Sequence, residues 1–156
     1  MKIVDKRRVL FSIDGGDKIM QKGFERKSVH TINEIRELTK EVLFEPNKKK
    51  SKVELDGDMI KGNSQRYQLF FTKGMKCVCC GIEGKYFAKE RNVGSKDSYH
   101  LNLYGIDKNG NEMLITKDHI LPASKGGKNH LSNYQTMCMK CNTLKGTSTG
   151  VELKVG

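Results

Sequence analysis

Two pairs of cysteines, each with two residues between its members, constrain the fold of this chain more than any other feature. The first pair is Cys77 and Cys80, and the second is Cys138 and Cys141. Each pair can wrap one turn so that both thiolates face a single point, and two such turns supply the four-sulfur tetrahedral site that structural Zn²⁺ takes. A zinc ion held there would join the start of a domain to its last helix, and its binding free energy would add directly to folding.

A redox pair and a set of disulfides are the two alternatives for these thiols. Neither pair opens a recognisable thioredoxin-like unit, which argues against a redox role. Residues 1–8 lack the apolar segment of a signal peptide, so we expect an intracellular, cytoplasmic protein. In that compartment cysteine pairs are more often metal ligands than disulfides. The fifth cysteine, Cys79, is expected to be a packed or unliganded thiol beside the zinc site.

Composition indicates a small domain with a polyanionic partner. The chain has 156 residues, of which 36% are apolar and none is Trp. Its core is therefore expected to be small and to need additional stabilisation, such as a bound metal ion. No apolar run is long enough to cross a bilayer, so we expect no membrane contact. The formal net charge is +11 and is spread over both halves of the chain, which favours nucleic acid as a partner. A lysine-rich surface kept for solubility would have the same composition.

Residues 1–63 are predicted to form an N-terminal arm of unknown role. Within it, residues 8–14 fit a short strand and residues 18–27 fit a loop. Ser28 resembles a helix start, and an apolar residue then recurs every three or four positions. This stripe predicts a helix from about Thr31 to Phe44, before Pro46. The lysine-rich run at 47–52 is either a polar loop or a phosphate contact, and the residues that follow it, up to Asn63, are weakly patterned.

The remaining residues give clearer local signals. Ser64 is expected to cap a short helix over 65–73, although those residues also fit a strand. Alternating residues at 99–107 and 112–119 flank Asn109-Gly110, which is a strong hairpin signal. A Gly-rich, basic loop over 122–133 should then lead to a short strand at 134–137 and a helix at 138–145.

Four residues in this last segment carry chemistry in a fixed order. Asp118 and His119 end an apolar run, Asn133 follows the Gly-rich loop, and Asn142 comes directly after the second cysteine pair. The segment resembles the HNH endonuclease family, whose motif reads D-H-I-x-P, then G-G, then N-L or similar, then C-x-x-C-N-x-x-K-G. The resemblance spans roughly residues 77–146. It implies an α+β protein in which residues 64–156 form a ββα-metal nuclease domain that is stapled by a four-cysteine zinc site.

The resemblance also implies a role for each of these residues. His119 falls on the general base that activates water, and Asp118 and Asn142 fall on ligands of the catalytic metal ion. Asn133 falls on the middle position, which shapes the loop and helps to hold the histidine. Asn142 stands where many members carry His, which leaves the choice of metal open. The residues expected to contact nucleic acid are Lys125, Lys128, His130 and Lys145.

The chemistry of these side chains agrees with the resemblance. Carboxylate and carboxamide oxygens suit Mg²⁺ or Mn²⁺ better than Zn²⁺, and a histidine can take a proton from water at neutral pH. We therefore predict a divalent-metal-dependent endonuclease that hydrolyses phosphodiester bonds of DNA, with RNA as an alternative substrate. By resemblance, the products are a 5′-phosphate and a 3′-hydroxyl.

Two other functions remain open at this stage: a non-catalytic zinc-stabilised nucleic-acid-binding module, and a zinc scaffold for protein partners. The small, lysine-rich composition would suit a phage or a mobile element. The pattern specifies neither a target sequence nor an oligomeric state.

Overall fold

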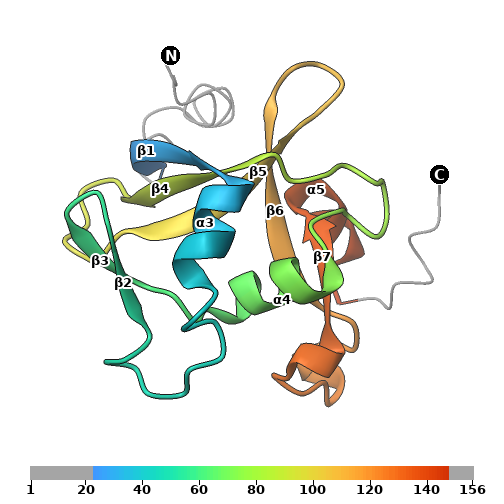
Figure 1. Cartoon of the computed structure of the whole chain (residues 1–156). Helices are drawn as coiled ribbons and strands as arrows, with labels where there is room; N and C mark the ends of the chain where they lie inside the picture. The colour runs from blue at the N-terminus through green and yellow to red at the C-terminus, as the bar shows by residue number, and fades with distance from the viewer. Residues whose placement is uncertain (1–22, 148–156) are drawn as a thin grey trace.

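The computed structural model describes residues 23–147 and shows a mixed α+β arrangement (Figure 1). Within these residues, five antiparallel strands form one sheet in the order β1-β4-β5-β6-β7, and β2 and β3 form a separate two-stranded sheet. The strands are β1 Phe24–Thr31, β2 Lys52–Leu55, β3 Asp58–Lys61, β4 Tyr86–Asn92, β5 His100–Ile106, β6 Glu112–His119 and β7 Tyr134–Cys138. The helices are α3 Ile32–Thr39, α4 Gln65–Lys73 and α5 Met139–Lys145, with single 3-10 turns η1 Ala123–Lys125 and η2 Leu131–Asn133.

Helix α4 packs against β6 and β7 and supplies much of the core. Its first turn is capped by the Ser64 hydroxyl, which accepts a hydrogen bond of 3.2 Å from the backbone N–H of Arg66. It ends at Gly74, whose φ of 113° favours glycine. The predicted helix over 65–73 is thus confirmed. Apolar side chains of α4 and of the sheet are fully buried together, and burial of each contributes about 1.5–3 kcal/mol. These side chains include Leu69, Phe70, Phe87, Leu101, Leu103 and Ile115.

Helix α3 begins within one residue of the predicted start but ends earlier than predicted. It begins after Thr31, whose hydroxyl accepts a hydrogen bond from the backbone N–H of Glu34, while the Glu34 carboxylate accepts one from the backbone N–H of Thr31. Ser28, which resembles a helix start in the sequence, lies within β1 instead. The helix ends at Thr39 rather than near Phe44, because the chain turns where the N–H of Val42 bonds the carbonyl of Thr39.

Residues 18–27 were predicted to form a loop, but strand β1 begins at Phe24, so the prediction is wrong for residues 24–27. β1 pairs with β4 and forms one edge of the five-stranded sheet, so residues 24–31 contribute to the same sheet as the later strands. The strand expected at residues 8–14 lies outside the described part of the chain. The division of the chain at residue 63 stays a prediction.

Strand β4 gave no sequence signal because charged side chains occupy its centre. Lys89 and Glu90 are both 0% exposed. Glu90 accepts hydrogen bonds from Arg26 at 2.6 Å and from the Tyr104 hydroxyl at 2.7 Å. Lys89 reaches out of the sheet to Asp58, with 2.5 Å between Nζ and Oδ2, and so attaches the β2–β3 hairpin. These ionic contacts between distant segments hold the arm against the sheet.

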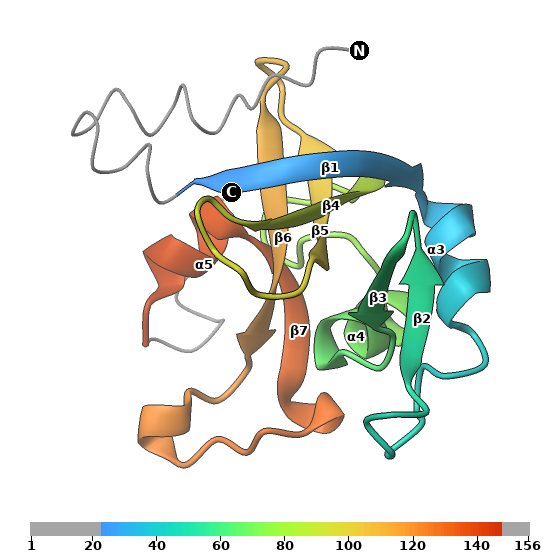
Figure 2. The ribbon, with the colours of Figure 1, turned by 90° about the vertical axis from the view of Figure 1, so that its left-hand side faces the viewer.

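The elements predicted for the last third of the described chain are present. β5 and β6 form the hairpin around Asn109-Gly110, with Gly110 at a φ of 81°. β6 then pairs with β7 across the loop 120–133, with Asp118 opposite Gln135, and α5 follows directly and packs against β6. Figure 2 shows β6 and β7 side by side with α5 after β7. In the described residues, 23–147, no helix has both the length and the apolar character to span a membrane.

Candidate metal centre and nuclease site

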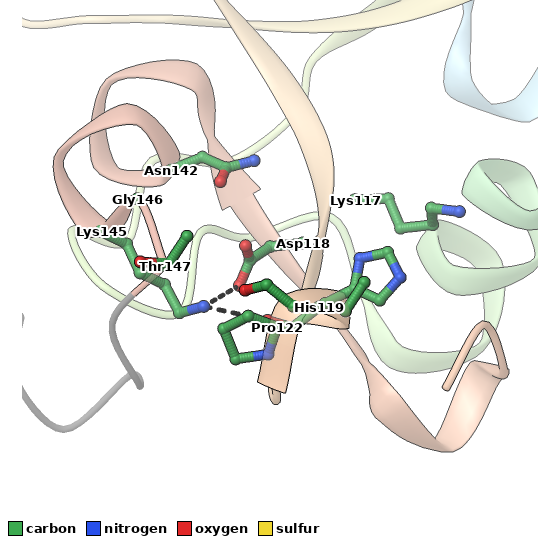
Figure 3. A pocket seen from close by; sticks show the side chains of 10 residues that line it. Lys117, Asp118, His119, Pro122, Asn142, Lys145, Gly146 and Thr147 are labelled. Atoms are coloured by element: carbon green, nitrogen blue, oxygen red, sulfur yellow. Dashed lines mark hydrogen bonds and ion pairs between the residues drawn. The ribbon is translucent and has the colours of Figure 1, made fainter. Parts of the chain in front are cut away.

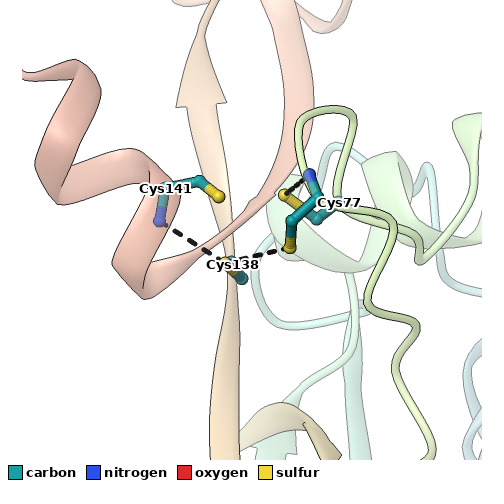
Figure 4. Close-up of side chains that lie close together, drawn as sticks. Cys77, Cys138 and Cys141 are labelled. Atoms are coloured by element: carbon teal, nitrogen blue, oxygen red, sulfur yellow. Dashed lines mark hydrogen bonds between the residues drawn. The ribbon is translucent and has the colours of Figure 1, made fainter. Parts of the chain in front are cut away.

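The four cysteines of the two predicted pairs converge on one point. Cys77 follows α4, Cys138 ends β7 and Cys141 lies in α5 (Figure 4). Together with Cys80, their sulfur atoms all lie within 4.8 Å of one another, and the Sγ atoms of Cys80 and Cys138 are 3.8 Å apart. A tetrahedron with Zn–S bonds of about 2.3 Å has edges of about 3.8 Å. The cluster is therefore positioned to bind a metal such as zinc, and Cys79 lies outside it.

Backbone N–H groups point at the sulfur atoms of this cluster. The amides of Cys79 and Cys80 lie 3.4 and 3.5 Å from Sγ of Cys77, and the amide of Cys141 lies 3.4 Å from Sγ of Cys138. Burial raises the pKa of the Cys138 thiol to about 11. Burial also acts to raise the pKa of Cys77, but the backbone N–H groups outweigh it and lower that pKa to about 7. A bound cation would offset the cost of keeping these buried sulfurs as thiolates.

A second site lies where β6 ends beside α5. A hollow of about 400 Å³ opens there, and its lining includes Asp118, His119, Asn142 and Lys145 (Figure 3). The structure therefore brings together three of the four residues predicted to be catalytic. The fourth, Asn133, lies in the loop between β6 and β7.

Two oxygen atoms in this hollow keep free coordination positions. Oδ2 of Asp118 accepts a hydrogen bond of 2.9 Å from Gln135 and lies 3.2 Å from Nζ of Lys145. The amide nitrogen of Asn142 donates a 2.9 Å hydrogen bond to the Thr116 hydroxyl. Within residues 23–147, Oδ1 of Asp118 and Oδ1 of Asn142 make no hydrogen bond, and Figure 3 shows the two side chains pointing toward one another. Both atoms could hold a divalent cation.

His119 is fixed by two contacts on its ring. Its Nε2 atom lies 2.7 Å from Oδ1 of Asn129. The ring also meets the Tyr134 ring edge-on, with 5.1 Å between centroids and an interplanar angle of 89°. Sequence reasoning missed Asn129, because no spacing rule marks a single polar residue in a Gly-rich loop as a partner of the histidine.

Asn133 holds the loop rather than the imidazole. Its side-chain amide spans the loop, since Oδ1 accepts from the N–H of Leu121 at 2.9 Å and Nδ2 donates to the carbonyls of Leu121 and Lys128, each at 3.0 Å. The loop is tight here, because a Cβ atom on Gly127 would lie 1.7 Å from the Leu121 carbonyl oxygen. The loop-shaping role expected of Asn133 fits these contacts, whereas the ring of His119 is bonded by Asn129.

The residues expected to contact nucleic acid fall into two groups. Lys125, Lys128 and His130 are exposed on the loop before β7. Lys145 is buried, with 1% of its side chain exposed, and its Nζ donates a 2.9 Å hydrogen bond to the carbonyl oxygen of His119. This lysine is therefore placed to hold the end of β6 and the carboxylate of Asp118.

Lys117 is a further lining residue of the hollow that sequence reasoning missed. Its Nζ lies 4.1 Å from the centre of the Tyr134 ring and bonds Oε1 of Gln65 at 3.2 Å. Burial, and then the nearby charge of Arg66, lower the pKa of the Lys117 ammonium. Side chains alternate between the two faces of a strand, so Lys117 lies on the same side of β6 as His119, two residues later. This spacing is the sequence signal that could have identified Lys117.

Comparison with known proteins agrees with this geometry. The model of a family described as HNH endonuclease matches residues 107–154, a segment that includes β6, β7 and α5. Searches of curated proteins and of solved structures found no match. The matched segment contains Asp118, His119 and Asn142 together with the second cysteine pair. Through this segment, the chain is similar to the HNH endonuclease family.

Proposed function

We propose that this protein is a divalent-metal-dependent endonuclease that hydrolyses phosphodiester bonds of DNA. The match of residues 107–154 to the HNH endonuclease model supports nuclease activity in general and a nucleic-acid substrate. The observation that carries the more specific proposal is that Asp118, His119 and Asn142 line a single hollow. A net charge of +11 supports a polyanionic substrate, because DNA binding is dominated by its phosphates.

The donor set of the hollow fits Mg²⁺ or Mn²⁺. Asp118 and Asn142 each offer an oxygen atom, and both cations prefer oxygen ligands. A cation held by only two side chains keeps positions for phosphate oxygens and water, and when bound it stabilises negative charge on the reacting phosphate. The four-cysteine cluster fits Zn²⁺ in a structural role.

His119 is proposed to act as the general base. It takes a proton from a water molecule, whose oxygen forms a bond to phosphorus while the bond from phosphorus to the 3′ oxygen breaks. The 3′ oxygen leaves with the bonding electron pair and takes up a proton from solvent. The products are then a 5′-phosphate and a 3′-hydroxyl. Lys145 holds the strand end and the Asp118 carboxylate in place through its two contacts.

The exposed loop is proposed to contact the phosphate backbone. Lys125, Lys128 and His130 project from the segment beside the hollow, and each neutralised phosphate makes DNA binding more sensitive to salt. We propose further that residues 64–156 form the ββα-metal unit, with β6, β7 and α5 as its two strands and helix, and that the protein acts inside the cell. Recognition of any particular target would come from residues before this unit.

One observation also favours a second candidate, a non-catalytic zinc-stabilised module that binds nucleic acid. The ammonium of Lys145 lies 3.2 Å from the Asp118 carboxylate, where it competes with a cation for the same negative charge. Such a module would keep the basic loop and the zinc cluster but would cut nothing.

The test is cleavage of defined DNA and RNA substrates across a panel of divalent metals, with zinc content measured on the same sample. The proposal predicts cleavage of DNA with Mg²⁺ or Mn²⁺, none with a chelator of the catalytic metal, and one zinc ion per chain. Tight, salt-sensitive binding without cleavage in every metal would favour the binding module instead. Cleavage of RNA alone would contradict the assignment of DNA.

A further inference from the structure

The hydrogen bond from His119 to Asn129 joins the proposed general base to a residue with no assigned role. Asn129 lies in the loop between β6 and β7, and its Oδ1 is 2.7 Å from Nε2 of His119. A carboxamide oxygen can only accept a hydrogen bond, so Nε2 must be the donor. A neutral imidazole has one N–H, which leaves the lone pair on Nδ1.

We propose that Asn129 is a positioning residue that holds the His119 ring with its proton on Nε2 and leaves Nδ1 to accept the proton of the attacking water. This inference rests on the proposed function, in which His119 is the base. Nδ1 makes no hydrogen bond to any residue between 23 and 147, and His119 lines the hollow that also holds Asp118 and Asn142. The hydrogen bond between His119 and Asn129 is exposed, so solvent can reach the imidazole ring.

The loop backbone fixes the position of Asn129 from both sides. The residue before it, Lys128, has its carbonyl bonded by Nδ2 of Asn133 at 3.0 Å. The residue after it, His130, has its carbonyl bonded by the backbone N–H of Asn133 at 2.8 Å. Asn133 therefore holds His119 indirectly, because it fixes the two neighbours of the residue that bonds the ring.

The Tyr134 ring supplies the second constraint on the imidazole. It meets the His119 ring edge-on at 5.1 Å and restricts the ring's tilt, but it cannot distinguish the two ring nitrogens. Asn129 makes that distinction, because its oxygen lies next to Nε2 alone.

The kinetic test compares Asn129→Ala, which removes the acceptor, with Asn129→Asp, which keeps one. Asn109→Ala is the matched control, because it removes an exposed asparagine at the opposite end of β6, in the β5–β6 turn. We expect Asn129→Ala to lower kcat by about 10- to 100-fold, the usual effect of losing an orienting partner, with little change in KM. Asn129→Asp should recover most of this loss. An Asn129→Ala variant with the full kcat would overturn the proposal.

The second readout is the imidazole region of the ¹H–¹⁵N NMR spectrum at a pH where the ring is neutral. The proposal predicts an Nε2–H signal of His119 that is protected by the hydrogen bond, so that it exchanges with solvent more slowly in the wild type and in Asn129→Asp than in Asn129→Ala. A proton on Nδ1, or the same protected signal in all three proteins, would overturn it even if the rate falls. Zinc content and circular dichroism establish that each variant is folded.

These readouts separate the inference from the proposed function. If the wild type cuts no nucleic acid with any metal while His119 shows a protected Nε2–H that depends on Asn129, the nuclease proposal fails and the proposal that Asn129 orients the ring stands. If the wild type cuts and His119→Ala does not, but Asn129→Ala cuts at the full rate, the nuclease proposal stands and the role of Asn129 fails.

Discussion

The ammonium of Lys145 lies 3.2 Å from Oδ2 of Asp118 and donates a 2.9 Å hydrogen bond to the carbonyl oxygen of His119. One residue of α5 therefore holds the last two residues of β6. The side chains of Lys145 and Asp118 are 1% and 7% exposed, so the pair is shielded from water. Removing one member of such a pair leaves an uncompensated buried charge, whose cost is larger than the net contribution of the intact pair.

Replacement of this lysine should therefore destabilise the fold. We expect Lys145→Met to lower the free energy of unfolding by about 3–5 kcal/mol, measured by urea denaturation. The control is Lys140→Ala, an exposed lysine of the same helix, which should change it by less than about 0.5 kcal/mol. Equal stability of Lys145→Met and the wild type would show that the ion pair does not brace β6.

Replacing a cysteine of the four-cysteine cluster should affect zinc binding and folding, whereas replacing Cys79 should not. Cys138→Ser should bind no zinc and lose most of the folded structure, because a metal ion held by the four cysteines would join the end of α4 to β7 and α5. Cys79→Ser should keep one zinc per chain and the wild-type melting temperature. Elemental analysis and circular dichroism measure both properties. Zinc retained by Cys138→Ser, or lost from Cys79→Ser, would mean that the ligand set is different.

Asn142 provides a test of the catalytic metal site. Removal of its oxygen in Asn142→Ala should weaken Mn²⁺ binding, followed by electron paramagnetic resonance, by more than about tenfold. Asn142→Asp should retain or tighten the binding, because it keeps an oxygen and adds a negative charge. Thr143→Ala is the control, since Thr143 is exposed on the same helix. Unchanged Mn²⁺ affinity in Asn142→Ala would exclude Asn142 as a ligand.

The attachment of the β2–β3 hairpin should depend on pH. Hydrogen bonds from Lys27 and Lys89 lower the pKa of Asp58 from 3.8 to about 2. A lowered pKa in the folded state stabilises the fold fully above pH 3.8, and this contribution is lost as the pH falls toward 2. Asp58→Asn should therefore melt at a lower temperature than the wild type at pH 7, and the difference should shrink near pH 2. A difference of constant size would contradict the ion pair.

Local signals in the sequence predicted the elements that carry the site. The hydroxyl of Ser64 caps α4, Asn109-Gly110 turns the β5–β6 hairpin, and the spacing of the cysteines predicts their convergence. Each of these signals acts over a few residues, so it can be read without the fold. The Asp56-Gly57 turn of the β2–β3 hairpin is a local signal of the same kind, with φ angles of 49° and 83°. Its two strands are too short and too polar to be recognised from the sequence.

The features that could not be predicted depend on contacts between distant residues. β1 and β4 pair around a buried network in which Arg26 bonds Glu90 at 2.6 Å and Glu112 at 2.8 Å, and no periodicity reveals such a network. The partner of His119 was missed for the same reason, since the path of the loop decides which side chain reaches the ring. The inward direction of Lys145 likewise follows from how α5 packs on β6.

The most direct test of the nuclease proposal is single-turnover cleavage of plasmid DNA by wild type and His119→Ala at saturating enzyme, each purified in parallel with a mock preparation. With His119 as the general base, the variant should cut about 10²- to 10⁴-fold more slowly while it still binds zinc and DNA. If His119→Ala cuts as fast as the wild type, and the mock preparation does not cut, His119 is not the base and the proposed mechanism is wrong.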